Sequence, residues 1–257
     1  FTRNSRSIQL TAAGAEWYEA TVVALDGLQR AAGRARRIAR GTGSLRVSLS
    51  ARFASNWLLP RLPRWRTAHQ EVELSFDVSD ELRDFDADDI DAAIRFGTGR
   101  YPQTHSQRLF DTVIAPVCSP RLIEAGARFE HPRDLLQHTL CHVDWKTDGM
   151  VWPNWRMWMA AAGIDDFDDS GCVAFTDSGY VVQAVIDGGG VGLADLDMID
   201  NDLAHGRLLR LFDIGLKVAP DYAYHLVYPQ RSDEDARILA LRDWLLDEIG
   251  RPATPAV

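Results

Sequence analysis

The sequence is poor in cysteine and has no long apolar run. Its three cysteines, Cys118, Cys141 and Cys172, are odd in number and far apart, which argues against a disulfide framework. No apolar run reaches the roughly 20 residues of a membrane-spanning helix. Residues 1–6 are not followed by the apolar segment of a signal peptide. These absences predict a location in the reducing cytoplasm and no contact with a membrane.

The sequence also lacks the motifs of the common enzyme classes. It has no G-x-S-x-G elbow, no phosphate-binding P-loop and no H-E-x-x-H zinc motif. The glycine run 188–192 precedes a predicted strand, whereas a phosphate loop opens a helix. His138, Cys141 and His142 lie along a predicted strand, and no second cluster completes a metal site. We therefore predict no enzyme activity, no cofactor and no metal; a small-molecule enzyme is the least favoured alternative.

Lysine is almost absent, and the arginines are unevenly placed. Residues 1–44 carry seven arginines against three acidic side chains, whereas the other 213 residues carry 21 basic and 34 acidic side chains. Such a basic end indicates either a segment that binds nucleic acid or another polyanion, or a solvated basic helix. The acidic run at 84–91 lacks the ligand spacing of an EF-hand and is predicted to be a solvated turn.

Residues 11–40 are predicted to form one long helix, with Thr11 as its N-cap. Mostly apolar residues recur along it at alternating spacings of four and three, which is the seam of a coiled coil. The seam runs through Trp17, Thr21, Ala24, Leu28, Ala31, Ala35 and Ile38. A second copy of the chain is the partner that we predict for this seam, and packing against the chain's own body is the alternative.

Beyond a linker at 41–44, strands and helices alternate to the end of the chain. This alternation predicts α/β layers with mostly parallel sheets, including one long strand at 109–117. The number of strands predicts two small α/β subdomains, the first of which is completed by the last strand and helix of the chain. Three tryptophans at helical spacing are predicted to pack in the core or between the subdomains: Trp152, Trp155 and Trp158.

Two strand-to-helix turns carry the candidate binding residues. The turns comprise Ser50, Arg52 and Phe53 after one strand, and Thr176, Asp177 and Ser178 after another. Each turn places N–H and hydroxyl groups at the carboxyl edge of its sheet, where open α/β sheets bind ligands. Facing each other across a cleft, the two turns would hold a small anion such as a carboxylate. Two ordinary helix N-caps are the alternative.

Eight short segments, in the right order along the chain, carry a family resemblance. They are residues 1–14, 53–63, 91–97, 116–120, 134–140, 175–179, 190–194 and 243–246. The first segment reads F-x-R-x-x-R-x-x-x-L-T-x-x-G, which is close to the wing and following helix start of LysR-type transcriptional regulators. The whole set resembles that family, in the subgroup related to the glycine-cleavage and β-lactamase activators.

The resemblance implies an α/β effector-binding domain at 45–250, with the two-lobed fold of type 2 periplasmic binding proteins. A long dimerisation helix at 11–41 would precede it. The first lobe would comprise 45–115 and 221–250, and the second lobe 116–220.

Residues 1–10 would be the remnant of a winged helix-turn-helix, so that the chain starts inside the wing and binds DNA poorly by itself. Arg3 and Arg6 would be the wing residues that approach DNA. We therefore predict a DNA-binding transcription regulator that senses a small effector and forms a homodimer or homotetramer. A solute-binding protein of the same fold, serving transport, is the alternative.

The resemblance also assigns residues to the effector site. It adds Thr98, on the hinge side, and Tyr224, on the returning strand, to the six residues of the two turns. Arg52 stands where the family commonly has Ser or Thr, and an arginine there favours an anionic or amino-acid-like effector. His142 and Trp145 would be either neighbours of the site or core residues.

Overall fold

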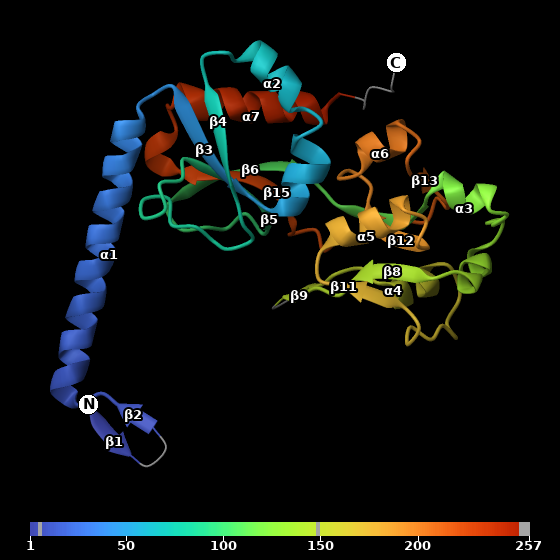
Figure 1. The fold of residues 1–257 in the computed structure, drawn as a ribbon, viewed down its shortest axis with the longest axis horizontal. Coiled ribbons are helices and arrows are strands. Elements are labelled where there is room, and N and C mark those ends of the chain that lie inside the picture. Colours follow the sequence, from blue (N-terminus) through green and yellow to red (C-terminus); the bar gives the residue numbers. More distant parts are fainter. Residues whose placement is uncertain (5–6, 148–149, 252–257) are drawn as a thin grey trace.

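Two β-sheets, each covered by helices, form the body of the protein, and one long helix projects from the first of them (Figure 1). The computed structural model describes residues 1–4, 7–147 and 150–251. We call each sheet with its helices a lobe. Each lobe encloses a hydrophobic core of its own, so the two sheets are packed separately.

The first lobe is built on a five-stranded sheet. Its strands are β3 (Ser44–Leu49), β4 (Glu73–Val78), β5 (Ala92–Gly97), β6 (Thr104–Phe110) and β15 (Ala223–Pro229), in the spatial order β4-β3-β5-β15-β6. β3 pairs in parallel with β4 and β5, whereas β15 runs antiparallel between β5 and β6. The sheet is covered by the π-helix η1 (Phe53–Leu58), α2 (Leu62–Ala68) and α7 (Ala236–Ile249), and the 3-10 turn η3 (Gln230–Ser232) leads into α7.

The second lobe is built on a six-stranded sheet. Its strands are β7 (Val113–Cys118), β8 (Leu140–Val143), β11 (Val173–Phe175), β12 (Val191–Asp195), β13 (Leu209–Arg210) and β14 (Leu216–Lys217). β8 pairs in parallel with β11 and β12, and β7 pairs antiparallel with β12, β13 and β14. The helical elements are α3 (Pro120–Glu124), η2 (Pro132–Gln137), α4 (Trp155–Ala161), α5 (Ser178–Ile186) and α6 (Asp200–Ala204); the short strands β9 (Lys146–Thr147) and β10 (Met150–Val151) pair with each other.

Two sequence predictions about the sheets were wrong. The sheets are mixed rather than mostly parallel, because β15 and β7 each run against their neighbours. The predicted strand at 109–117 is two strands: β6 ends at Phe110 in the first lobe, and β7 begins at Val113 in the second. The polar pair Asp111 and Thr112 carries the chain between the lobes. The predicted boundary between the two lobes, at 115/116, falls inside β7, and β7 pairs only with strands of the second sheet. The predicted domain limits stay a prediction.

The long helix predicted at 11–40 is confirmed as α1 (Ala12–Arg40). The Thr11 hydroxyl accepts a hydrogen bond from the Gly14 N–H at 3.1 Å, which makes it the predicted N-cap. At the far end of α1, β1 (Thr2–Asn4) and β2 (Ser7–Gln9) pair as an antiparallel hairpin (Figure 1). Arg3 lies in β1, and Arg6 lies outside the described residues. In the described ranges, no helix is both long and apolar enough to cross a membrane.

The predicted coiled-coil seam of α1 faces solvent. Trp17 is 77% exposed and Leu28 is 66% exposed. The other predicted seam positions are exposed as well: Thr21, Ala24, Ala31, Ala35 and Ile38. The alternative that the seam packs on the chain's own body is therefore wrong, because the seam residues are exposed along the whole helix, whose N-terminal part projects from the first lobe (Figure 1). The predicted pairing with a second copy is not tested by a single chain.

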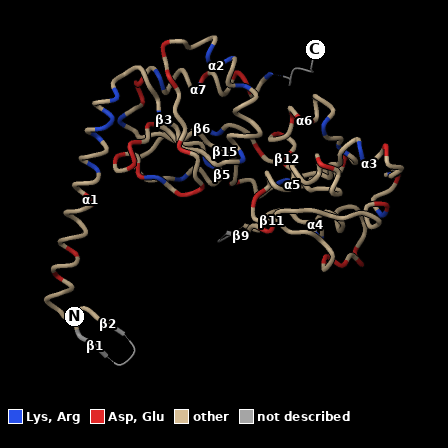
Figure 2. The backbone as a smooth tube through the Cα atoms, viewed as in Figure 1, with Lys and Arg blue, Asp and Glu red and all other residues tan. Residues whose placement is uncertain are grey.

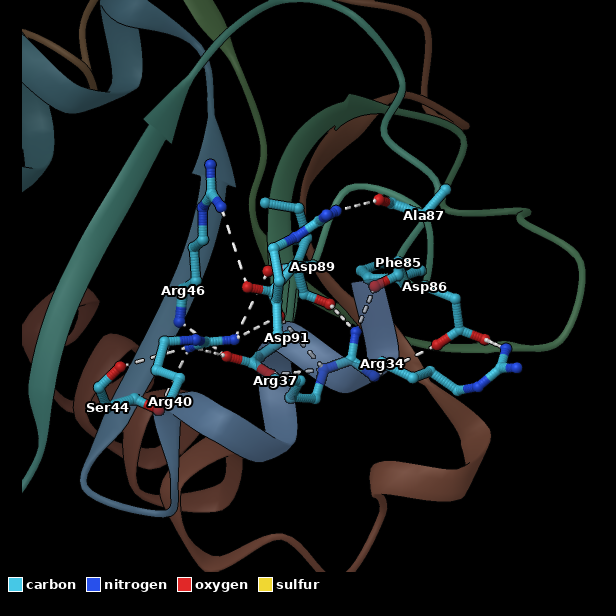
Figure 3. A network of polar contacts seen from close by, with 12 residues as sticks. Arg34, Arg37, Arg40, Ser44, Arg46, Phe85, Asp86, Ala87, Asp89 and Asp91 are labelled. Carbon is cyan, nitrogen blue, oxygen red and sulfur yellow. Dashed lines mark hydrogen bonds and ion pairs between the residues drawn. The ribbon is translucent and has the colours of Figure 1, made fainter. Parts of the chain in front are cut away.

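The last turns of α1 bind the acidic run at 84–91, and we call this contact the arginine joint (Figure 3). Arg40 contacts Asp91 at 2.7 Å and Asp89 at 2.9 Å, and Arg37 contacts Asp91 at 3.2 Å. The surrounding pairs are Arg30 with Asp84 at 3.2 Å, and Arg34 and Arg37 with Asp86 at 3.6 and 3.2 Å. Figure 2 shows the basic half of α1 beside this acidic loop.

Gly33 lets the helix backbone approach the acidic run. It is the buried residue of α1, and a Cβ atom built on it would lie 1.6 Å from the carbonyl oxygen of Asp86. The prediction of a solvated acidic turn was wrong, because the carboxylates are neutralised by arginines from a helix that is distant in the sequence. Arg37 and Arg40 are therefore held in partly buried ion pairs rather than simply solvated, and binding of a polyanion by the basic end stays a prediction.

Candidate functional site

A cavity of about 230 Å³ lies between the two lobes, at the carboxyl ends of their parallel strands. Ser50 and Asp80 follow β3 and β4 in the first lobe, and the segment from Thr176 follows β11 in the second. The lining residues are Ser50, Arg52, Asp80, Ile94, Arg95, Phe96, Val143, Trp145, Trp152, Thr176, Asp177 and Ser178. This is the edge at which open α/β sheets bind ligands.

Arg52 crosses the cavity from the first lobe to the second. Its Nη1 atom donates a hydrogen bond to the Ser178 hydroxyl at 3.1 Å. The guanidinium carbon lies 5.2 Å from the ring centroid of Trp152 and 5.6 Å from that of Tyr224. Both rings are within cation–π distance, so they hold the guanidinium in place without consuming its hydrogen-bond donors.

Arg52 has no carboxylate within ion-pair distance among the described residues, although it is partly buried. Burial acts to lower the pKa of Arg52, but the nearby Tyr224 and Asp195 and the lining residues Asp177 and Asp80 raise it above its usual value. The side chain therefore stays charged. A planar cation with free donors in a cavity is suited to bind a carboxylate through two hydrogen bonds.

Two carboxylates flank this cation. Asp80 and Asp177 line the same cavity as Arg52, and neither forms an ion pair within the described part of the chain. Asp177 is also the N-cap of α5, where its side chain accepts a hydrogen bond from the Gly179 N–H at 2.6 Å. A cation flanked by two carboxylates complements a molecule that carries both an anionic and a cationic group.

The helix ends themselves are already capped. The Ser50 hydroxyl accepts a hydrogen bond from the Phe53 N–H at 3.2 Å, and Asp177 caps α5. Both turns are thus ordinary side-chain caps, which was the alternative to an anion site formed by helix ends. The Arg52 side chain, rather than the backbone amides, supplies the positive charge of the cavity.

Three buried polar atoms lie behind Arg52 without a hydrogen-bond partner among the described residues. They are Asp195 Oδ2, Thr112 Oγ1 and the Tyr224 hydroxyl, and each of these residues is 3% exposed or less. Burial raises the pKa of Asp195 to about 7, although Arg52 acts to lower it. Burial likewise raises the pKa of Tyr224. Asp195 and Tyr224 thus lie close enough to Arg52 to act on its charge.

The structure brings together five of the eight residues assigned to the site from the sequence: Ser50, Arg52, Thr176, Asp177 and Ser178. Phe53 instead packs in the first core, with its ring centroid 5.1 Å from that of Trp57. Tyr224 contacts the Arg52 guanidinium through its ring but does not line the cavity. Thr98 is exposed and does not line the cavity.

Of the two residues expected either beside the site or in the core, Trp145 lines the cavity and His142 does not. His142 is partly buried, its Nδ1 atom has no hydrogen-bond partner among the described residues, and burial lowers its pKa. Within the described ranges, no group of three or more His, Cys, Asp or Glu residues could hold a metal ion.

Sequence reasoning missed six lining residues of the cavity: Asp80, Ile94, Arg95, Phe96, Val143 and Trp152. Asp80 follows β4 just as Ser50 follows β3, so its place at the same edge could have been inferred from the strand order. Trp152 belongs to the second core and is 3% exposed, yet its ring also faces Arg52. The other two tryptophans of the set, Trp155 and Trp158, lie in that core as predicted.

The chain is similar in sequence to a known family and to two transcriptional activators. A model of the family described as LysR substrate binding domain matches residues 39–250. The glycine cleavage system transcriptional activator of Escherichia coli K12 is 31% identical over 246 residues, which are 96% of this chain and 78% of that protein. The transcriptional activator AmpR of Citrobacter koseri is 34% identical over 202 residues, 79% of this chain and 66% of that protein.

Among solved structures, the effector domain of the transcriptional regulator AmpR of Pseudomonas aeruginosa superposes with a TM-score of 0.62 and 30% sequence identity. The superposition covers 80% of this chain and 95% of that domain. The two-lobed effector-domain fold expected from the sequence is thereby confirmed.

Proposed function

Because the chain belongs to the LysR-type transcriptional regulators, we propose that it senses a small molecule carrying both a carboxylate and an ammonium group. Regulators of this family bind DNA and small-molecule effectors and oligomerise. The chain is accordingly a transcription regulator with an effector-binding domain. Its relatives are regulators rather than enzymes, and the transport alternative is not favoured.

Arg52 is the observation that carries the proposal. Among described arginines without an ion pair, only Arg52 and Arg95 are not exposed, and Arg52 is the one whose side chain reaches across the cleft, to Ser178. A carboxylate on Arg52 would supply the missing counter-charge. An amino group would then lie between Asp80 and Asp177, whose negative charges face the same cavity. The effector class is therefore that of a free amino acid.

The effector would act by changing the relation between the lobes. Arg52 belongs to the first lobe and Asp177 to the second, so a molecule bound to both favours one lobe arrangement. A differential affinity of a few kcal/mol is enough to shift such an equilibrium. We propose that the α1 helices of two chains pair along their seams, and that α1 transmits the change in lobe arrangement to the DNA-binding ends.

Arg3 and Arg6 would contact DNA at those ends. Both a dimer and a tetramer are compatible with this arrangement, and we propose that the protein acts in the cytoplasm.

Calorimetric titration with the free amino acids tests the effector class. Each amino acid that binds is compared with its amide, which lacks the carboxylate, and with its N-acetyl form, which lacks the ammonium group. We expect both blocked forms to bind roughly tenfold more weakly or worse, since each loses a charged hydrogen bond. Arg52→Met should abolish binding, and Arg121→Met, which removes an exposed arginine of the second lobe, should not. Equal binding of the blocked forms contradicts the proposal.

A further inference from the structure

A second cavity lies in the first lobe, away from the cleft. Its volume is about 330 Å³, at the lower end of the range of small-molecule sites. It opens between the loop at 82–86, the segment at 101–104 and the end of β15. Arg30 of α1 stands at its rim. Arg95 is the residue that its lining shares with the cleft cavity.

Arg95 is a buried cation at the wall of this cavity. It is 8% exposed, and side-chain alternation along β5 places it with Ala93, on the opposite face to Ile94 and Phe96. Ala93 lines the second cavity, whereas Ile94 and Phe96 line the cleft. The Arg95 side chain is therefore directed to the second cavity.

The charge of Arg95 has no carboxylate partner in the described part of the chain. Its Nη2 atom donates to the Ser48 hydroxyl at 2.6 Å and to the Glu81 carbonyl at 2.9 Å. Its Nη1 atom donates to the Ile94 carbonyl at 3.3 Å. These neutral acceptors satisfy some of its N–H groups, and Asp77, bonded to the Ser48 hydroxyl at 3.1 Å, and Asp80 act on its charge from beyond ion-pair distance. Among the described residues, no carboxylate lies directly on the guanidinium. An anion in the cavity would supply a direct counter-charge.

The rest of the wall is apolar at its centre and basic at its rim. The apolar lining comprises Leu82, Phe85, Ala93, Pro102, Val227 and Pro229. Four arginines and two acidic residues line the cavity, and Arg95 is the arginine of these four without an ion pair among the described residues. The remaining three arginines, Arg30, Arg83 and Arg231, pair with Asp or Glu at the surface. An apolar body with one negative group fits these walls best.

We propose that this cavity is a second small-molecule site, distinct from the cleft, that binds an aromatic carboxylate with its carboxylate on Arg95. Ala93 and Tyr101 line this cavity and not the cleft, so they separate the two sites in an experiment. The proposal does not depend on the effector class of the cleft, because the two ligands bind to different walls.

Phenylacetate is the probe, and phenylacetamide is its neutral control of the same shape. Binding is followed by backbone amide chemical shifts of the full chain. We expect phenylacetate at millimolar concentration to shift amides at 82–86 and 101–104, but not at 176–179. Phenylacetamide should bind roughly tenfold more weakly or worse, because it cannot form a charged pair with Arg95.

Three variants complete the test. Arg95→Met and Ala93→Leu, which respectively remove the charge and fill the cavity, should each weaken phenylacetate binding at least tenfold, with folding checked by circular dichroism. Arg52→Met should leave it unchanged, because Arg52 lines only the cleft side. Absence of binding by the wild-type chain, shifts confined to 176–179, or equal binding of the amide would each overturn the proposal.

Discussion

Arg52 of the first lobe and Ser178 of the second are joined by a hydrogen bond of 3.1 Å across the cleft. Because Ser178 opens α5 and Arg52 precedes η1, the bond connects the helices that follow two sheet edges. The lobes are also joined by the ion pair of Arg61 with Asp200 and by Met198, which packs in the core of the first lobe. Closure of the cleft in this chain is therefore supported by its own side chains.

Replacing Ser178 with Ala should loosen the cleft without altering its charge. The loss of one hydrogen bond to a charged group should lower the free energy of unfolding by about 1–3 kcal/mol. Amide hydrogen exchange at the start of α5 should become faster. Ser170→Ala is the matched control, because the Ser170 hydroxyl bonds only to Asp168 in an exposed turn. Unchanged exchange in Ser178→Ala would mean that the bond does not hold the lobes together.

Gly33→Ala should disrupt the arginine joint. The added methyl group would lie 1.6 Å from the Asp86 carbonyl oxygen, so α1 or the acidic loop has to move. We expect the free energy of unfolding in urea to fall by about 1–3 kcal/mol, as in other overpacked sites. Gly27→Ala adds the same methyl group with nothing within 4 Å, and it should stabilise the helix by up to about 1 kcal/mol. Equal effects of the two substitutions would contradict the close approach.

Asp91→Asn should destabilise the joint far more than Asp84→Asn does. Asp91 is 4% exposed and accepts hydrogen bonds from Arg40 and from the Arg46 N–H. Removing its charge leaves Arg40 partly buried without its shortest ion pair, which should cost about 3 kcal/mol. The pair of Asp84 with Arg30 is exposed and should contribute less than about 1 kcal/mol. Urea denaturation of the two variants measures the difference, and similar losses would contradict it.

Most of the fold could be predicted from the sequence, because strand and helix periodicity matches the structure over most elements. The failure at 109–117 has a physical origin. The apolar residues on both sides of Asp111 and Thr112 look alike, although they pack in two different cores. Local pattern gives no information about which core a residue enters.

The arginine joint was missed although both of its halves were noticed. Arg30, Arg34 and Arg37 are spaced to lie on one face of a helix, and the acidic run has the opposite charge. Only the fold brings them together, since about 50 residues separate Arg37 from its partners. The cleft residues Arg52, Asp177 and Ser178 were predictable because each follows a strand. The spacing of Trp152 predicted packing in the core or between the subdomains, and it could not show that the ring also faces Arg52.

Asp195→Asn should change how stability depends on pH. An unfolded Asp loses its proton near pH 3.9, but folded Asp195 keeps it up to a pKa of about 7. Between these values the folded state binds more protons than the unfolded chain, so the free energy of unfolding falls as pH rises. The loss is complete above about pH 7. The variant should therefore gain stability over wild type progressively from pH 4 to 7, by a few kcal/mol at most. Parallel stability curves would contradict this prediction.

The exposed seam of α1 is expected to be the surface through which two chains associate. Leu28 lies on the seam and Val23 lies off it, yet both are apolar and exposed, at 66% and 73%. If two α1 helices pair along the seam, Leu28→Glu places two carboxylates in an apolar interface and should convert dimers to monomers in sedimentation analysis. Val23→Glu adds the same charge at a solvent position and should leave the dimer intact. Monomers in both variants, or dimers in both, would show that another surface holds the chains together.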